Sequence, residues 1–186
     1  MKFIDLASAN TDCINETAGL LLEGFRNTGS TAWKTREQAL RTVEKSLDER
    51  RISRVALDTR GDVLGWIAGM PRYDGRVWEI HPLVVRLDRR HRGIGRALVA
   101  DLECEARKRQ GLTLYLGSDD ENARTTIGGV DLYPGVLRKL AGIESRHDHP
   151  FEFYRRMGFE VVGVVPDANG FGKPDILMAK RIGTAA

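Results

Sequence analysis

The sequence contains little cysteine and no long apolar run. Cys13 and Cys104 are its two cysteines, and they fit no metal-binding spacing. No apolar stretch follows a basic N-terminus, and none is long enough to cross a bilayer. These absences argue against a secretory signal and against a membrane span. We therefore expect a cytoplasmic protein in a reducing compartment, with both cysteines in helices as small packing residues.

Repeats, low-complexity tracts and a strong net charge are also missing. The formal charge of +3 over 186 residues is too small to indicate nucleic-acid binding by itself. A chain of this length can bury a core without disulfides or metals, and residues 1–186 are expected to form a single domain. The charge is unevenly distributed, because residues 86–96 carry five arginines and a histidine whereas residues 118–121 read SDDE. This separation indicates an anion bound in one place and a cation in another.

Apolar periodicity and turn residues predict seven strands and five helices. The strands are expected at residues 2–7, 53–57, 63–70, 77–85, 112–117, 161–165 and 176–181, and the helices at 12–25, 35–47, 94–110, 134–143 and 149–157. The loop NTGSTAW, residues 27–33, joins the first two helices. Runs of adjacent strands flanked by helices favour a mixed, mostly antiparallel α/β sheet over a doubly wound parallel one.

The stretch RRHRGIGRAL, residues 89–98, is typical of a backbone site for an anion. Gly93 and Gly95 let the backbone approach a ligand that side chains would keep away. The helix that follows offers unpaired N–H groups and the positive end of its dipole. No Ser, Thr, Asp or Asn directly precedes Gly93 to cap these donors. Pro82 on the preceding strand cannot donate a ladder hydrogen bond, which indicates an edge, a bulge or a broken pairing there.

Three interpretations of these glycines compete. A dinucleotide-binding fingerprint needs a third glycine where Leu98 stands, and no early βαβ unit surrounds the segment. A Walker loop needs Lys followed by Ser or Thr after its last glycine, and that pair is absent. The third interpretation is a helix that begins with two glycines by chance. Uncapped donors among arginines favour a pyrophosphate.

Several blocks of the sequence resemble one enzyme family. Arg90-x-x-Gly93-x-Gly95, between a strand and a helix, resembles the acetyl-coenzyme A signature of the GNAT acetyltransferases. WEIHPLVV, TLYLGSDDE, HPFEFYRRMGFEVVGVVP and NGFGKPDILMAK, which begin at residues 78, 113, 149 and 169, are similar to blocks of the aminoglycoside 6′-N-acetyltransferases. The resemblance covers the chain from about Val63 onward and implies the GNAT fold. That fold is α/β (α+β), with a mixed, mostly antiparallel central sheet flanked by helices and splayed at the acetyl-CoA site.

The resemblance also implies a binding site for acetyl-coenzyme A. The backbone amides of seven residues would wrap its pyrophosphate: Arg90, His91, Arg92, Gly93, Ile94, Gly95 and Arg96. Leu83, Val84 and Val85 would pair with the pantetheine arm like an added strand. Their N–H groups would polarise the thioester carbonyl and stabilise the oxyanion that forms during attack.

Glu79 and His81 are the candidate groups at the acceptor amine. They lie two residues apart on one strand and therefore share a face of the sheet, together with Leu83 if the pleat is regular. The resemblance implies that both line the acceptor pocket and that Glu79 is the base, acting directly or through water. The alternative for Glu79 is a structural acceptor of internal hydrogen bonds.

Four further residues complete the predicted site. Tyr154 matches the family tyrosine that protonates the departing thiolate, and its ordinary pKa of about 10 suits that task; the alternative is a packing residue of a short helix. Asp119 and Asp120 either form a carboxylate rim for the ammonium groups of an aminoglycoside or lie in a solvated loop. Trp33 either stacks on a sugar ring or anchors its loop.

The function that follows is direct acetyl transfer from acetyl-coenzyme A to an aminoglycoside 6′-amine, without a metal and without an acetyl-enzyme. The same fold acting on a polyamine, a peptide N-terminus or a metabolite amine is the first alternative. A nucleic-acid-binding module that uses the basic residues 86–96 is the second, but that segment lacks interleaved aromatic residues. The resemblance implies a homodimer, with no nucleic-acid or membrane partner.

Overall fold

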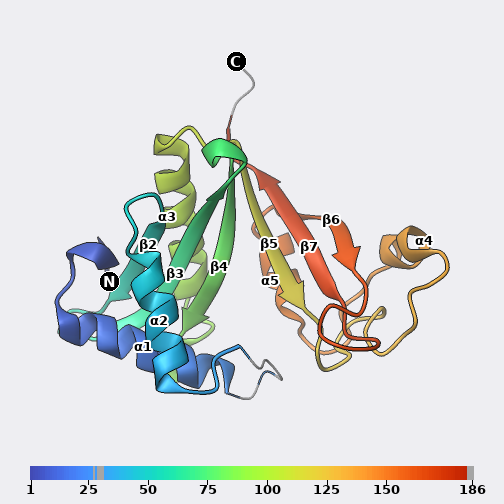
Figure 1. The fold of residues 1–186 in the computed structure, drawn as a ribbon, viewed down its shortest axis with the longest axis horizontal. Coiled ribbons are helices and arrows are strands. Elements are labelled where there is room, and N and C mark those ends of the chain that lie inside the picture. The colour runs from blue at the N-terminus through green and yellow to red at the C-terminus, as the bar shows by residue number, and fades with distance from the viewer. Residues whose placement is uncertain (27, 29–31, 184–186) are drawn as a thin grey trace. The chain divides into compact units, whose positions relative to one another are not determined.

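The computed structural model describes residues 1–26, 28 and 32–183. Its contacts divide the chain into two compact units. The first comprises Met1–Leu114 with the C-terminal segment from Ile182, and the second comprises Tyr115–Arg181. Figure 1 shows the strands and helices of both units. The single domain expected from the sequence stays a prediction.

The predicted strands and helices are present, with small shifts of their ends. In the first unit they are β1 (Lys2–Asp5), α1 (Thr11–Phe25), α2 (Arg36–Ser46), β2 (Ile52–Leu57), β3 (Val63–Arg72), β4 (Val77–Val85) and α3 (Ile94–Lys108). The second unit holds most of β5 (Thr113–Asp119), then α4 (Val136–Ala141), α5 (Pro150–Arg155), β6 (Glu160–Val165) and β7 (Asp175–Arg181). The strands are hydrogen-bonded in the order β1-β2-β3-β4-β5-β7-β6. The expected α/β fold with a largely antiparallel sheet and flanking helices is confirmed.

In the first unit, helices cover both faces of the strands (Figure 1). The helices α1 and α2 cover one face through a core that contains Leu21, Val43 and Trp66. The helix α3 covers the other face, where a Cβ on Gly65 would lie 2.9 Å from Leu98 Cδ1. Caps explain where the first two helices begin: the Asn10 side chain accepts from the Cys13 N–H, and α2 begins with a capping box at Thr35.

The pairing of β3 with β4 contains an irregularity at Pro82. Ile67 pairs with Leu83, but Gly69 pairs with Ile80. Two residues of β4, His81 and Pro82, therefore lie opposite one residue of β3. Of the edge, bulge or broken pairing that a proline without an N–H indicated, the structure shows a bulge.

In the second unit, β6 and β7 pair antiparallel. The short helix α5 begins after His149, whose ring nitrogen Nδ1 accepts from the Phe151 N–H at 3.2 Å. Gly158, expected just beyond this helix, has a φ of 85°, which glycine adopts without strain.

The two cysteines have different environments. Cys104 is exposed, so the packing role expected for it is wrong, whereas Cys13 is half-buried against the α1–α2 core. Residues 27 and 29–31 of the predicted loop lie outside the described residues. No helix in the described part of the chain is long and apolar enough to cross a membrane.

Candidate functional site

The helix α3 begins at a turn whose backbone has alternating handedness. His91 (φ 60°) and Gly93 (φ 82°) are both left-handed, and no side chain caps the helix at Gly93. The first hydrogen bond of the helix runs from the Ala97 N–H to the Gly93 carbonyl at 3.0 Å, so the N–H groups of residues 94–96 precede the ladder. N–H groups in such a turn converge on a concavity that suits an anion. A Cβ on Gly93 would have no heavy atom within 4 Å, so the space beside the turn is open.

The arginines around this turn have different environments. Arg90 Nη2 donates to the Gly24 carbonyl at 3.3 Å, and its Nε donates to the Val85 carbonyl at 3.4 Å. This guanidinium thereby joins the end of α1 and the end of β4 to the turn, and burial lowers its pKa. Arg92 and Arg96 are exposed and can meet an anion or solvent. These two hydrogen bonds give the Arg90 side chain a structural role beside the turn.

Glu79 and His81 share one face of β4, as predicted. Glu79 pairs across the strands with Met70, which follows Ala68 on the face packed against α1 and α2. Leu83 does not share this face. Beyond the bulge it is Val84 that packs against α1, where a Cβ on Gly24 would lie 2.3 Å from Val84 Cγ2. The pleat is not regular at Pro82, where the bulge adds a residue to β4. Leu83 and Val85 therefore face the side of the sheet opposite to Glu79 and His81.

Glu79 is held by an arginine that sequence reasoning missed. Arg72 donates from Nε to Glu79 Oε2 at 2.7 Å, and its Nη2 lies 2.7 Å from the same oxygen. The Glu79 side chain is 22% exposed. Nothing in the sequence singles out Arg72, because the contact arises from the pairing of β3 with β4.

The imidazole of His81 lies against a buried tryptophan. The rings of Trp33 and His81 have centroids 5.6 Å apart, and Trp33 also contacts Phe25 at 4.6 Å. Trp33 is 8% exposed, and its Nε1 donates to Thr42 Oγ1 at 2.9 Å. An indole buried in this way anchors its loop and supports His81, so of the two interpretations left open by the sequence the structure favours the loop anchor over stacking on a sugar ring.

Tyr154 lies on α5 in the second unit. Its ring packs edge-on against Phe153 and Phe159, with centroids 5.0 and 5.5 Å away. Burial raises the pKa of its phenol above the ordinary value. The phenol is protonated at neutral pH, as an ordinary tyrosine is, and burial makes it a weaker acid.

The two aspartates after β5 are not equivalent. Asp119 is exposed at its carboxylate, which accepts from Asn169 Nδ2 at 2.5 Å. Asp120 is 1% exposed. Its carboxylate accepts from the Arg124 N–H and from the N–H and hydroxyl of Thr125, at 2.7, 2.9 and 2.7 Å. The sequence left Asp120 either in a carboxylate rim or in a solvated loop; its burial argues against solvation, and its carboxylate organises the loop around it.

His149 was not identified from the sequence as part of the site, yet it connects two of its elements. Its Nε2 hydrogen-bonds the Asp119 carbonyl at 3.0 Å, so Nε2 carries the proton and Nδ1 accepts at the start of α5. It is 2% exposed, and burial lowers its pKa. The signal that could have found it is its position directly before Pro150, where a helix begins.

No group of three or more His, Cys, Asp or Glu side chains is arranged to hold a metal ion within the residues described.

Comparison with known proteins agrees with this geometry. The model of the acetyltransferase (GNAT) family matches residues 18–127, which is more than half of the chain. This chain belongs to the GNAT acetyltransferase family. The match includes Glu79, His81 and the turn before α3.

Solved structures of GNAT enzymes give a finer comparison. An aminoglycoside 6′-N-acetyltransferase in complex with coenzyme A is 36% identical, with 100% of this chain and 99% of that chain covered and a TM-score of 0.90. The aminoglycoside 6′-N-acetyltransferase from Enterococcus faecium gives the same values. An aminoglycoside 6′-acetyltransferase type Ii is 31% identical over 100% of both chains, with a TM-score of 0.76. A search of curated protein sequences finds no match.

Proposed function

We propose that this GNAT enzyme transfers an acetyl group from acetyl-coenzyme A directly to the 6′-amine of aminoglycosides, and so confers resistance to them. The observation that carries the proposal is the 36% identity, over the whole chain, to an aminoglycoside 6′-N-acetyltransferase solved with coenzyme A. The residue types at the predicted site support it, because they suit an anionic coenzyme and a cationic acceptor.

The turn before α3 would bind the pyrophosphate of the coenzyme through the backbone N–H groups of residues 90–96. The open space beside Gly93 supports this assignment. The strand edge at Leu83, Val84 and Val85 would pair with the pantetheine arm.

Transfer forms an amide C–N bond and breaks the thioester C–S bond. The amine nitrogen gives up a proton, and the sulfur of the departing thiolate takes one. Glu79 and His81 would hold the acceptor amine and receive its proton, directly or through water. Tyr154 would donate to the thiolate, because its phenol is protonated at neutral pH.

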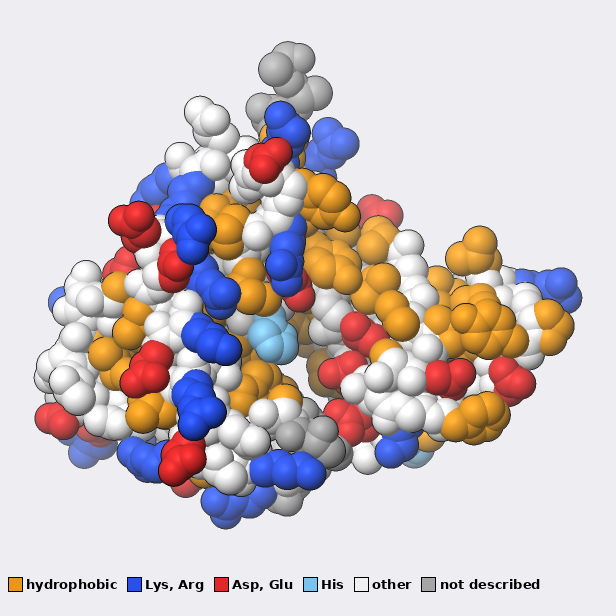
Figure 2. Space-filling model, in the orientation of Figure 1, with side chains coloured by type: hydrophobic (Ala, Val, Ile, Leu, Met, Phe, Trp, Pro, Cys, Tyr) orange, Lys and Arg blue, Asp and Glu red, His pale blue; other side chains and the backbone are white. Residues whose placement is uncertain are grey.

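An aminoglycoside carries several ammonium groups, and the carboxylates of the second unit offer partners for them. Figure 2 shows acidic side chains gathered on the visible face of this unit. Asp119 is the member of the predicted rim whose side chain is exposed, and we assign it to acceptor binding. Exposed carboxylates would also steer a polycation toward the enzyme.

We further propose a homodimer that acts in the cytoplasm. Exposed apolar side chains on the second unit support an interface there, since Val162 and Phe171 are 60% and 81% exposed. No nucleic-acid or membrane partner is proposed.

A thiol-release assay with acetyl-coenzyme A across an amine panel tests the function. Kanamycin and tobramycin are expected to react and to yield products acetylated at the 6′-amine. Turnover confined to polyamines or peptide N-termini would refute the aminoglycoside assignment while leaving the enzyme an acetyltransferase. A trapped covalent acetyl-enzyme would refute direct transfer.

A further inference from the structure

The proposed base, Glu79, already has a cationic partner within its own sheet. Glu79 pairs across the strands with Met70, and Arg72 lies two residues further along β3. Residues separated by two positions on a strand point to the same face, so Arg72 is a diagonal neighbour of Glu79. A long side chain can span such a diagonal.

The geometry of this ion pair is one-sided. Two nitrogens of the Arg72 guanidinium, Nε and Nη2, both lie 2.7 Å from the same carboxylate oxygen, Oε2. The second oxygen, Oε1, is not used in this contact and can accept from another donor. Arg72 is 52% exposed and Glu79 is 22% exposed, so the carboxylate is the more enclosed partner. The arginine therefore restrains the carboxylate rotamer without using both of its oxygens.

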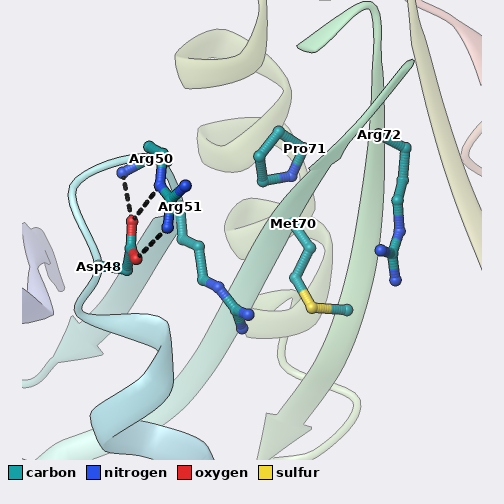
Figure 3. A pocket seen from close by; sticks show the side chains of 6 residues that line it. All are labelled: Asp48, Arg50, Arg51, Met70, Pro71 and Arg72. Carbon is teal, nitrogen blue, oxygen red and sulfur yellow. Dashed lines mark hydrogen bonds and ion pairs between the residues drawn. The ribbon is translucent and has the colours of Figure 1, made fainter. Parts of the chain in front are cut away.

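Arg72 also lines a cavity of about 160 Å³, together with Asp48, Arg50, Arg51, Met70 and Pro71. Figure 3 shows the side chains of Met70 and Arg72, which lie on β3, and of Arg51, which lies in the bend just before β2. Arg50 is paired with Asp48 at 2.9 Å. Among these three arginines, Arg72 is the partner of Glu79, and Arg51 offers a matched positive charge in the same cavity.

We propose that Arg72 is a positioning residue for Glu79 in acetyl transfer. The proposal rests on the function proposed above, in which Glu79 holds the acceptor amine. Two N–H groups on Oε2 fix the carboxylate so that Oε1 receives the acceptor ammonium. A guanidinium suits this task because its planar fork delivers two hydrogen bonds from one rigid group.

This role predicts a specific kinetic pattern. Arg72→Gln leaves Glu79 in place but releases its rotamer, so the reacting amine is held less accurately. Loss of positioning lowers the transfer rate steeply, and about a tenfold loss is expected here. The KM for a cationic acceptor does not rise, because the substitution also removes a positive charge from beside the acceptor site. A contact that only bound substrate would raise KM instead.

The test is a double-mutant cycle with the complete chain, measured as the single-turnover rate of acetyl transfer. The variants are Arg72→Gln, Glu79→Gln and the double variant, with Arg51→Gln as the control. Arg72→Gln is expected to slow transfer about tenfold, and Arg51→Gln is expected to leave the rate unchanged. In the Glu79→Gln background, Arg72→Gln is expected to add nothing, because the two residues act as one unit.

Three results would overturn the proposal. They are an unchanged rate in Arg72→Gln, an equal loss in the Glu79→Gln background, and an equal loss in Arg51→Gln. The second would identify a general structural role, and the third a general effect of charge in the cavity. The cycle can be run with any amine that the unmodified enzyme accepts. Failure of the aminoglycoside assignment is therefore seen in the unmodified enzyme and is distinct from failure of the role of Arg72.

Discussion

Two glycines of this chain provide a matched test of the coenzyme site. Gly93 precedes α3 with a φ of 82°, and Gly61 lies in the turn between β2 and β3 with a φ of 93°. A Cβ at either position would meet no heavy atom within 4 Å. Alanine substitution therefore imposes a similar backbone cost on the folded protein at both positions. The two differ in that only Gly93 lies at the proposed phosphate site.

The expected magnitudes follow from this geometry. A non-glycine residue in the left-handed region costs about 1–2 kcal/mol, which corresponds to a decrease of roughly 2–8 °C in Tm for a chain of this size. In Gly93→Ala the added methyl group also occupies space beside the first N–H groups of α3. Loss of one hydrogen bond to a charged phosphate costs about 1.5–3 kcal/mol, or roughly a 10- to 150-fold weaker affinity for coenzyme A.

The assay is calorimetric titration with coenzyme A, combined with thermal unfolding of the free proteins. Gly61→Ala and Gly93→Ala are expected to unfold at similarly lowered temperatures, and only Gly93→Ala is expected to lose coenzyme affinity. Gly93→Val, with a larger side chain, is expected to abolish binding. Equal affinity in the Gly61 and Gly93 variants would refute the reasoning, because the phosphates would then lie elsewhere.

Three further predictions concern the second unit. Tyr154→Phe is expected to lower turnover more than coenzyme affinity, and unchanged turnover would remove Tyr154 from the mechanism. Asp120→Asn is expected to lower the free energy of unfolding by about 2 kcal/mol, because a buried acceptor of three hydrogen bonds is altered. A raised KM for the acceptor amine with unchanged stability would instead show that Asp120 binds substrate. Burial lowers the pKa of His149 in the folded state. Below about pH 6.5 the unfolded chain therefore binds more protons than the folded protein. The stability that neutral His149 contributes is lost as pH falls. His149→Asn, which keeps a side chain able to cap α5, is expected to show a shallower loss of unfolding free energy between about pH 7 and pH 5, and an identical slope would exclude His149 as its source.

Much of the fold could be predicted because local signals agree with the tertiary structure. The strand β4 has the predicted bounds, and the bulge at Pro82 is one of the three irregularities that the missing N–H of proline indicated. The short 3-10 helices at Leu6–Ser8 and Leu87–Arg89 were missed, since three residues are too few to show a period. The strand β5 extends to Asp119, where its polar residues give no apolar signal.

Features of the candidate site that depend on one strand or one turn could be predicted from the sequence. The spacing of Glu79 and His81 gives their shared face, and the glycines give the open turn before α3. Contacts between different elements leave no pattern in the sequence. The partner of Glu79 depends on which residue of β3 lies diagonally opposite, and the burial of Asp120 depends on the fold of its own loop.

The bulge in β4 turns different faces of one strand toward the two ligands proposed above. Before it, Glu79 and His81 project toward α1 and α2, where an acceptor amine is proposed to bind. After it, Val84 takes the face that packs against α1 at Gly24, and Leu83 and Val85 project to the other side. With regular pairing, Leu83 would share the face of Glu79, and Val84 would point away from α1. The backbone of α1 at Gly24 would then have no Val84 side chain to pack against. The Arg90 guanidinium, which binds the carbonyls of both Gly24 and Val85, would lose this arrangement of its two acceptors. The extra residue at His81-Pro82 thus connects the acceptor face to the position of the turn that begins α3.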